Sequence, residues 1–373
     1  MRTLLLGLCL IVPLPASAQL GCDMPVELND GWSRATPAQV GIDSKRLCRI
    51  DNFLAQWPEH NIHAVVVARR GKLVMDRYFT GPDERWRTPL GPVVHAAEQM
   101  HDLRSITKGV VSLLVGIAIG EGKFPSLDSS AIDFFPEHSP VRTIANARIT
   151  FRHLLYMSSG IAWNESIPYS DPANSENRMN AALAPIRYVF SQPVVTPPGT
   201  TYNYNGGNTV ILGNAVDKAA GELAAYAREK LFERLDFGLL EWVYMPQGRD
   251  PAFASGLRLR PRDTAKLGQI MLTDGVWNGR QVVPKGWSAE SIQPRINGSG
   301  VYFYGYQWWL GRSLHQGREH TWFAGFGEGG QRLFVVPSLE LVVMINAGDY
   351  GGALQGVIPT AIFNDLVLPA IAN

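Results

Sequence analysis

The segment SITKGVVSLLVGIAIG, residues 105–120, decides the fold of this chain. The residues after Lys108 are nearly all apolar and would cover every side of a helix. Such a pattern is typical of a helix buried inside a large protein rather than of an amphipathic surface helix. Residues three positions apart lie on one helix face, with Cβ atoms about 5–6 Å apart, so the side chains of Ser105 and Lys108 are predicted to meet where the helix begins.

Ser105 and Lys108 have the chemistry of a nucleophile with its base. Burial disfavours the charged form of lysine, and a neutral lysine can take a proton from a serine hydroxyl. The alternative is a capping hydroxyl followed by a lysine that reaches water from the first turn. An SxxK pattern arises by chance about once in a chain of this length, so the assignment depends on further motifs.

Composition favours a globular protein acting on small molecules. The chain has 373 residues, 46% of them hydrophobic and 18% charged, and its formal net charge is +1. One large domain, or two lobes that share a core, fits this length. A charge so close to zero gives no field that would recruit nucleic acid or an anionic membrane. After the N-terminus no stretch approaches eighteen continuous apolar residues, so we expect no membrane span.

Residues 1–18 have the pattern of a signal peptide. Arg2 is followed by an apolar stretch, and Ala16-Ser17-Ala18 is a small-residue cleavage site, so we expect an exported, periplasmic or secreted protein that begins at Gln19. Export leaves Cys22 and Cys48 as an even pair in an oxidising compartment, which predicts a disulfide between them. Lipidation of Cys22 is the alternative, although Gln19 stands where a leucine is usual.

The remaining pattern predicts an α+β fold. We expect a helix over 44–56 followed by a hairpin of strands over 62–68 and 73–79, and near the other end a hairpin of strands over 331–336 and 339–346 followed by a helix over 357–371. The region between them is richer in helical patches and loops. An antiparallel sheet from both termini, flanked by helices and interrupted by a mostly helical lobe, is therefore the simplest architecture, with the active site between the lobes. We expect one domain over 19–373, its α/β lobe about 19–125 and 255–373, and its helical lobe about 126–254.

Two further segments supply candidate site residues. Tyr204 lies in a loop before an apolar helix, and a nearby ammonium would favour its anionic form as a second base. The run Gly325-Phe326-Gly327-Glu328 precedes the second hairpin, and glycines at a strand edge let a ligand approach. The NH groups of Ser105 and Glu328 could then form an oxyanion hole. An ordinary packed tyrosine and a glycine-rich turn are the alternatives.

Together, SITK, PGTTYNYNG (198–206) and GFGEGGQRLFVVPSLELVVMINAG (325–348) resemble the penicillin-recognising serine hydrolases, most closely the class C β-lactamase branch. That branch includes esterases and 6-aminohexanoate-dimer hydrolases, and the resemblance extends from about Gly31 to the C-terminus. It implies a β-lactamase/transpeptidase-like fold, with Ser105 as nucleophile, Lys108 as its paired lysine and Tyr204 as the tyrosine of the YxN motif. The tyrosine motif stands in place of the SDN of class A relatives.

Two departures from the family pattern bear on the substrate. Gly206 stands where the YxN motif ends in asparagine, and Gly325 stands where the KTG motif has its lysine. The lysine would hold the carboxylate of a β-lactam or peptide, and Arg332 or His320 could substitute for it. The loss favours an ester or simple amide over a β-lactam.

A loop and a histidine-containing segment hold further candidate residues. Residues 163–172 resemble the loop that overhangs the site in 6-aminohexanoate-oligomer hydrolases, which implies a substrate contact for Tyr169, alongside Gly325, Phe326 and Gly327. Packing of Tyr169 on neighbouring prolines is the alternative. His95, Glu98 and His101 have a spacing that would turn them to different sides of a helix, so we predict no metal site there.

The sequence thus predicts an exported serine hydrolase that cleaves carboxylic esters or simple amides through an acyl-serine, resembling the 6-aminohexanoate-dimer hydrolases. We expect a small-molecule substrate, no nucleic-acid partner and no cofactor or metal. A β-lactamase or D-alanyl peptidase, and a non-catalytic penicillin-binding-like sensor, are the alternatives. A Ser-His-Asp hydrolase is disfavoured because no GxSxG elbow precedes a helix.

Overall fold

The computed structural model describes residues 23–248 and 250–372. The predicted signal peptide and Cys22 lie outside these residues. Cys48 is disulfide-bonded, and its pairing with Cys22 stays a prediction. Within the described residues no helix has the length and apolar character needed to cross a bilayer.

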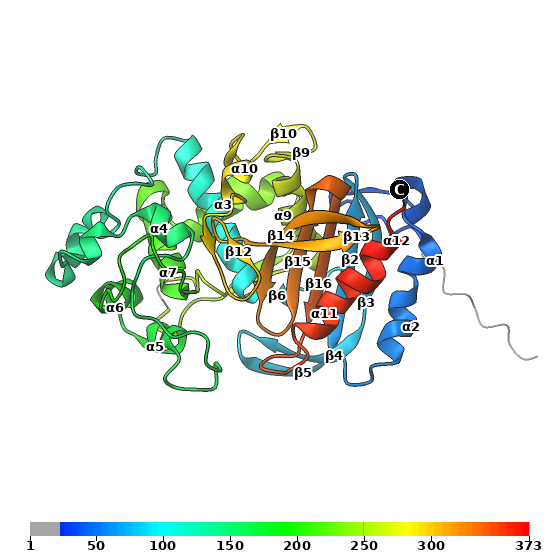
Figure 1. Cartoon of the computed structure of the whole chain (residues 1–373), viewed down its shortest axis with the longest axis horizontal. Helices are drawn as coiled ribbons and strands as arrows, with labels where there is room; N and C mark the ends of the chain where they lie inside the picture. Colours follow the sequence, from blue (N-terminus) through cyan, green and yellow to red (C-terminus); the bar gives the residue numbers. More distant parts are fainter. Residues whose placement is uncertain (1–22, 249, 373) are drawn as a thin grey trace, which may run out of the picture.

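A nine-stranded sheet is the centre of the molecule, in the order β1-β3-β2-β16-β15-β14-β13-β12-β11 (Figure 1). The two predicted hairpins lie side by side in it, because β2 pairs antiparallel with β16. The prediction of an antiparallel sheet built from both termini is therefore confirmed. Its strands are β1 (Ser33–Arg34), β2 (Ile62–Arg69), β3 (Lys72–Tyr78), β11 (Ile296–Asn297), β12 (Phe303–Tyr304), β13 (Trp309–His315), β14 (Arg318–Gly327), β15 (Gln331–Val336) and β16 (Leu341–Ala347).

Helices cover both faces of the sheet, which is why every residue of β2 is buried. Side chains alternate across a strand, so Val65 and Val67 belong to one apolar cluster while Val66 and Ala68 belong to the other. One face carries α1 (Ser44–Leu47), α2 (Arg49–Ala55), α11 (Val357–Ala361) and α12 (Leu368–Ala370), and the other carries α3 (Thr107–Gly120) and α9 (Pro261–Leu272).

Helix α3 is buried on all sides from Thr107 to Ala118, as its sequence predicts. It lies between the sheet and the helical lobe and packs against α7. The sheet side of α3 is close-packed because Gly109 leaves room for the ring of Trp308, which a Cβ atom would meet at 2.9 Å. The lobe consists of α4 (Phe151–Leu155), α5 (Ser175–Ala181), α6 (Pro185–Ser191), α7 (Gly206–Ala220) and α8 (Leu223–Ala227).

Smaller sheets fix the segment that leads into α3. Strand β6 (His101–Asp102) pairs with β8 (Leu257–Leu259), which pairs in turn with β7 (Leu240–Trp242). A hairpin of β4 (Thr80–Arg85) and β5 (Thr88–Val94), rich in proline and glycine, was not predicted. The remaining strands and α-helix are β9 (Val276–Trp277), β10 (Arg280–Gln281) and α10 (Trp287–Ser291).

The segment 95–100 forms no helix. The helical spacing on which we judged His95, Glu98 and His101 therefore does not apply. His95 follows the end of β5, and His101 lies in β6, so the backbone between them is free to turn the two imidazoles toward one point.

Candidate active site

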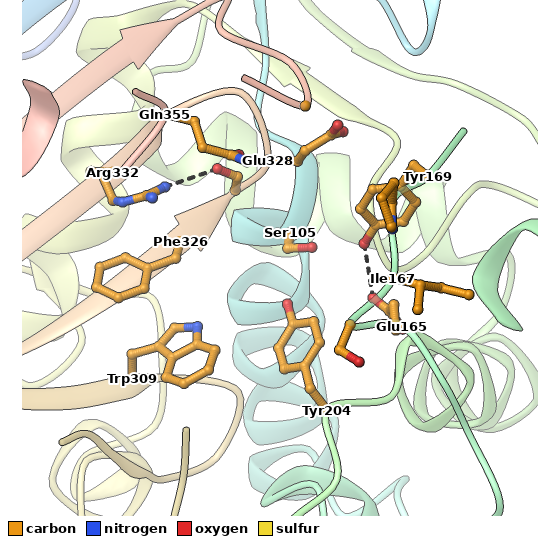
Figure 2. A pocket seen from close by; sticks show the side chains of 14 residues that line it. Ser105, Glu165, Ile167, Tyr169, Tyr204, Trp309, Phe326, Glu328, Arg332 and Gln355 are labelled. Carbon is orange, nitrogen blue, oxygen red and sulfur yellow. Dashed lines mark hydrogen bonds between the residues drawn. The ribbon is translucent and has the colours of Figure 1, made fainter. Parts of the chain in front are cut away.

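A short 3-10 turn, Arg104–Ile106, places Ser105 at the start of α3. Arg104 has a φ of +48°, a conformation that costs a non-glycine residue on the order of 1–3 kcal/mol. Its buried guanidinium holds the turn through ion pairs of 3.1 Å to Asp102 and 2.9 Å to Glu84. The turn is thus fixed from both sides, and Ser105 lines a cavity of about 410 Å³ (Figure 2).

Lys108 lies directly beneath Ser105. Its Nζ donates to Ser105 Oγ at 2.8 Å and to the carbonyl of Ala254 at 3.1 Å, and it lies 3.8 Å from Glu165 Oε1. The side chain is only 1% exposed. The structure therefore brings the serine and lysine of the SxxK motif into contact, one helical turn apart, with the amine shielded from solvent.

Tyr204 points its hydroxyl toward Ser105 from the loop before α7 (Figure 2). Burial, joined by the Glu165 carboxylate, raises the pKa of Tyr204 well above its usual range, and a hydrogen bond with Ser105 only partly opposes this. Lys108 Nζ lies over the ring face, 4.9 Å from its centroid. The expectation of an anionic phenol is therefore wrong, because burial outweighs the nearby cation, and Tyr204 is a neutral phenol in the resting site.

A pair of buried carboxyl groups, Glu165 and Glu176, lies beside this constellation and was missed from the sequence. Burial and the neighbouring Glu176 raise the pKa of Glu165 to about 7, whereas the pKa of Glu176 is lowered, chiefly by Lys108, against the cost of burial. The two carboxyls hydrogen-bond to each other. The pair therefore titrates as a unit, with the proton favoured on Glu165 and the negative charge favoured on Glu176, near Lys108.

The acid pair occupies the space that Gly206 leaves open. Gly206 NH donates to Glu165 Oε2 at 2.7 Å, and a Cβ atom at this position would meet Glu165 Oε2 at 3.2 Å and Glu176 Cδ at 3.5 Å. The missing YxN asparagine and the additional glutamates are therefore connected. No sequence spacing announces the pair, because Glu165 comes from a loop and Glu176 from α5.

Tyr169 lines the cavity, but its hydroxyl is engaged by the acid pair. It lies 3.1 Å from both Glu165 Oε1 and Glu176 Oε2 and can donate to only one of them at a time. Its ring, against which Arg87 packs at 4.8 Å, is what remains for contact with a ligand.

In the glycine-rich segment at the end of β14, some residues line the cavity and others pack in the core. Phe326, Gly327 and Glu328 line the cavity, whereas Gly325 is buried against Ile106 and does not. A Cβ at Gly327 would meet the Leu103 carbonyl at 2.4 Å, so glycine is required for β14 to approach the turn that carries Ser105. Glu328 is the next residue along the chain. No hydrogen bond within the described residues engages its backbone NH.

Of the two candidate substitute cations, only Arg332 reaches the cavity. Its guanidinium donates to the carbonyls of Gly327 and Gln331 at 2.9 and 2.8 Å and lies 4.8 Å from the centre of the Phe326 ring. Burial lowers the pKa of Arg332 to about 10, which leaves it charged at neutral pH. His320 instead contacts Ser338 at 2.8 Å and is absent from the cavity lining.

Comparison with known proteins identifies the family of this chain. The chain matches the Beta-lactamase family over residues 59–352 and belongs to that family. It is 25% identical over 359 residues to the 6-aminohexanoate-dimer hydrolase of Paenarthrobacter ureafaciens, a match that covers 88% of this chain and 83% of that protein. The protein is thus a hydrolase of the β-lactamase family.

Solved structures show the same fold. A family VIII carboxylesterase superposes with a TM-score of 0.63 at 16% identity, over 88% of this chain and 98% of that one. The octameric penicillin-binding protein homologue from Pyrococcus abyssi superposes with a TM-score of 0.61 at 19% identity, over 86% and 76%. The predicted β-lactamase/transpeptidase-like fold is therefore confirmed.

Proposed function

We propose that this protein is a serine hydrolase that cleaves carboxylic esters or simple amides through an acyl-serine intermediate. The observation that carries the proposal is the 2.8 Å contact between Lys108 Nζ and Ser105 Oγ at the wall of a cavity. A non-catalytic sensor has no need of a serine, a buried amine and a phenol joined in one network.

Each group has a place in the reaction. Lys108 takes the proton of Ser105 as Oγ attacks the substrate carbonyl, and the oxyanion accepts hydrogen bonds from the NH groups of Ser105 and Glu328. Tyr204, a neutral phenol, relays a proton to the leaving oxygen or nitrogen as the C–O or C–N bond breaks. Water then attacks the acyl-serine with the same groups in reverse, which releases the acid and restores Ser105.

The cavity walls favour a substrate with an apolar chain and a polar end. Trp309 and Phe326 stack with ring centroids 5.6 Å apart and form an apolar wall. Glu328 and Arg332 provide polar groups at its edge. An acyl or aminoacyl chain of the kind named in the 6-aminohexanoate-dimer hydrolase fits these walls, with Tyr169 and Phe326 in contact with the chain.

The test is a substrate panel on wild type and Ser105→Ala. p-Nitrophenyl esters and ω-amino-acid amides should be turned over by wild type only, and a fluorophosphonate should label wild type at Ser105 and leave the variant unlabelled. Labelling retained by Ser105→Ala would refute the assignment. Failure of every activated ester to acylate the wild-type protein would favour the sensor.

A second candidate is β-lactam or D-alanyl peptide hydrolysis, which the position of Arg332 favours. Its guanidinium, at the cavity wall, could pair with the carboxylate that the missing KTG lysine would otherwise hold. Nitrocefin turnover that depends on both Ser105 and Arg332 would establish this activity.

We also propose that the protein is exported and that residues 19–373 form one domain with a helical lobe over about 126–254. N-terminal sequencing of the mature protein should read from Gln19, and mass analysis without reduction should show Cys22 linked to Cys48. A lipid adduct on Cys22 would contradict both expectations.

A further inference from the structure

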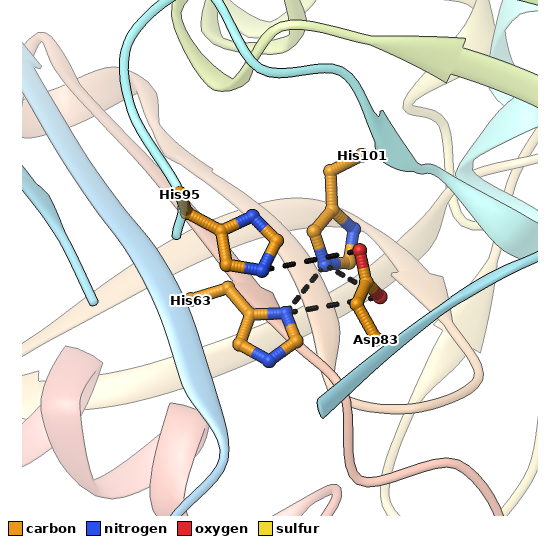
Figure 3. Close-up of side chains that lie close together, drawn as sticks. All are labelled: His63, Asp83, His95 and His101. Carbon is orange, nitrogen blue, oxygen red and sulfur yellow. Dashed lines mark hydrogen bonds and ion pairs between the residues drawn. The ribbon is translucent and has the colours of Figure 1, made fainter. Parts of the chain in front are cut away.

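Four ligand-type side chains, remote in sequence, converge on one point (Figure 3). His63 comes from β2, Asp83 from β4, His95 follows β5, and His101 lies in β6. All four are buried, with no more than 7% of any of them exposed. One ligand atom from each lies within 4.8 Å of every other. None of the four lines the cavity at Ser105.

Hydrogen bonds on the outer side of the cluster fix two imidazole tautomers. Asn61 donates its amide to the Pro82 carbonyl at 2.8 Å, which turns its oxygen toward His63 Nε2, also at 2.8 Å. His101 Nδ1 faces the Asp102 carbonyl at 3.0 Å. Both outer nitrogens face acceptors and therefore carry the protons, so His63 Nδ1 and His101 Nε2 carry lone pairs.

These two lone pairs point at each other. His63 Nδ1 and His101 Nε2 are 2.8 Å apart, and Asp83 Oδ1 lies 3.8 and 3.4 Å from them. Two acceptors and a carboxylate at such distances repel unless a positive charge lies among them. Both rings are buried, and burial favours the neutral imidazole, which is the form that ligates metals.

His95 supplies an independent observation. Its Nε2 is buried and has no hydrogen-bond partner among the described residues, while its side chain is only 3% exposed. The nitrogen points toward Asp83, with Oδ2 at 3.9 Å (Figure 3). An orphaned buried nitrogen is rare in native proteins and calls for a partner that the protein itself does not provide.

We propose that His63, Asp83, His95 and His101 form a closed binding site for a divalent transition metal, with Zn²⁺ as the preferred ion. Three imidazole nitrogens and one carboxylate oxygen suit zinc, whereas calcium and magnesium require mostly oxygen ligands. Ligands about 2.0–2.1 Å from a tetrahedral ion lie roughly 3.3 Å from one another. Four of the interligand distances, 2.8, 3.4 and 3.8 Å among His63, His101 and Asp83 Oδ1 and 3.9 Å from His95 to Asp83 Oδ2, bracket that value, and every pair of residues comes within 4.8 Å.

The surroundings hold three ligands in place and leave one to move. Tyr350 donates to Asp83 Oδ1 at 3.0 Å, which orients the carboxylate as outer partners do in known zinc sites. The ring of His95 stacks on that of His63 at 4.1 Å and 18°. Because a ligating imidazole holds its ion near the plane of the ring, His95 must tilt out of this stack when the metal binds.

The site has a structural role, since four protein ligands leave no open position for a substrate. It joins β2, the β4–β5 hairpin and β6, the strand that leads through Asp102 and Arg104 into Ser105. Tyr350 links the cluster to the same turn, because the Arg104 guanidinium lies 4.6 Å from the centre of its ring. The metal therefore fixes the base of the active-site turn without taking part in the reaction.

The first test measures zinc on the full-length mature protein after chelation and dialysis. Zinc should bind at one ion per chain and raise Tm by about 5 °C at a hundredfold excess over Kd. Cobalt in place of zinc should give the visible absorption of a tetrahedral ion, a measurement that needs no variant. Absence of saturable zinc binding, or a cobalt spectrum unchanged from the free ion, would overturn the proposal.

Two variants locate the site. His95→Phe keeps a ring against His63 but removes a ligand, and Asp83→Asn keeps an acceptor for Tyr350. Each should weaken zinc binding by about 100-fold, while His138→Gln, a histidine of the helical lobe, should bind zinc as wild type does. Equal binding by wild type and both ligand variants would place the metal elsewhere and refute the site. The readout does not depend on hydrolysis, so it stands or falls separately from the proposed activity.

Discussion

Two buried polar clusters share the segment 101–108, one through Ser105 and Lys108 and the other through His101. They differ in how many of their polar atoms have a hydrogen-bond or ionic partner within the protein. At the Ser105 cluster the Lys108 side chain has a hydroxyl, a carbonyl and a carboxyl group as partners, and both carboxyls of the acid pair lie within hydrogen-bond distance of the Tyr169 hydroxyl. At the histidine cluster two lone pairs and an orphaned nitrogen surround one carboxylate. The Ser105 cluster, whose polar atoms have partners within the protein, can pass protons among its own groups. The histidine cluster, whose lone pairs face one another, requires an added cation.

The largest effect is expected at the nucleophile of the complete network. Ser105→Ala should lower kcat/KM for p-nitrophenyl esters by on the order of 10⁵-fold, because no other group can form the acyl intermediate. Stopped-flow and steady-state assays with matched protein concentrations would measure this. Zinc binding by the variant should equal that of wild type, and its loss would show that the two clusters are not separate units.

Tyr204→Phe should remove the proton relay while leaving the fold intact. We expect a fall in kcat of about 10²–10³-fold, in the range of general acid–base catalysis. The loss should be greater for amides than for p-nitrophenyl esters, since nitrophenolate leaves without a proton. Equal losses for both substrates would contradict the assignment of Tyr204 as proton donor.

Glu165→Gln tests the acid pair through the pH dependence of stability. Because the pKa of Glu165 is raised to about 7 from an ordinary 4.5, the folded protein keeps a proton that the unfolded chain loses. The contribution of Glu165 to stability should therefore fall as pH rises from 4.5 to 7 and change no further above that, by on the order of 3 kcal/mol. Buried histidines such as His63 and His101, whose pKa is lowered by burial, act in the opposite sense up to about pH 6.5, so the test is the difference between wild type and variant. Glu176, whose pKa is lowered, makes stability rise with pH instead, but it does so below about pH 4.5, outside this window.

Denaturant unfolding at half-unit pH steps would follow the difference between wild type and Glu165→Gln. The stability of wild type relative to the variant should decline between pH 4.5 and 7. A difference that stays constant over this range would assign the titration to other groups.

The smallest effect concerns Arg332. Arg332→Met should raise KM by about 10-fold for substrates that carry a carboxylate and leave KM for neutral esters unchanged. A matched pair of p-nitrophenyl esters, one with a terminal carboxylate and one with a methyl group, would measure the difference. Equal KM values for the two in the variant and in wild type would exclude Arg332 as the substitute for the missing lysine.

Much of the fold could be predicted because it depends on short-range patterns. Apolar periodicity predicted the buried helix α3 and the strands of both hairpins, and β15 begins and ends at the predicted residues. The hairpin of β4 and β5 was missed, since its prolines and glycines give no strand pattern. The predicted helix over 44–56 is interrupted at Cys48, where α1 ends and α2 has yet to begin.

The sequence by itself determined the contact of Ser105 with Lys108, because helical geometry places residues three apart on one face whatever surrounds them. Tertiary structure alone decided that Glu165 meets Glu176, that Arg332 rather than His320 reaches the cavity, and that His63 meets His101. The partners in these pairs come from different elements, and no spacing along the chain specifies their approach. The tertiary structure also decides the protonation of Tyr204. Burial of the phenol, which the sequence does not specify, outweighs the effect of the nearby Lys108.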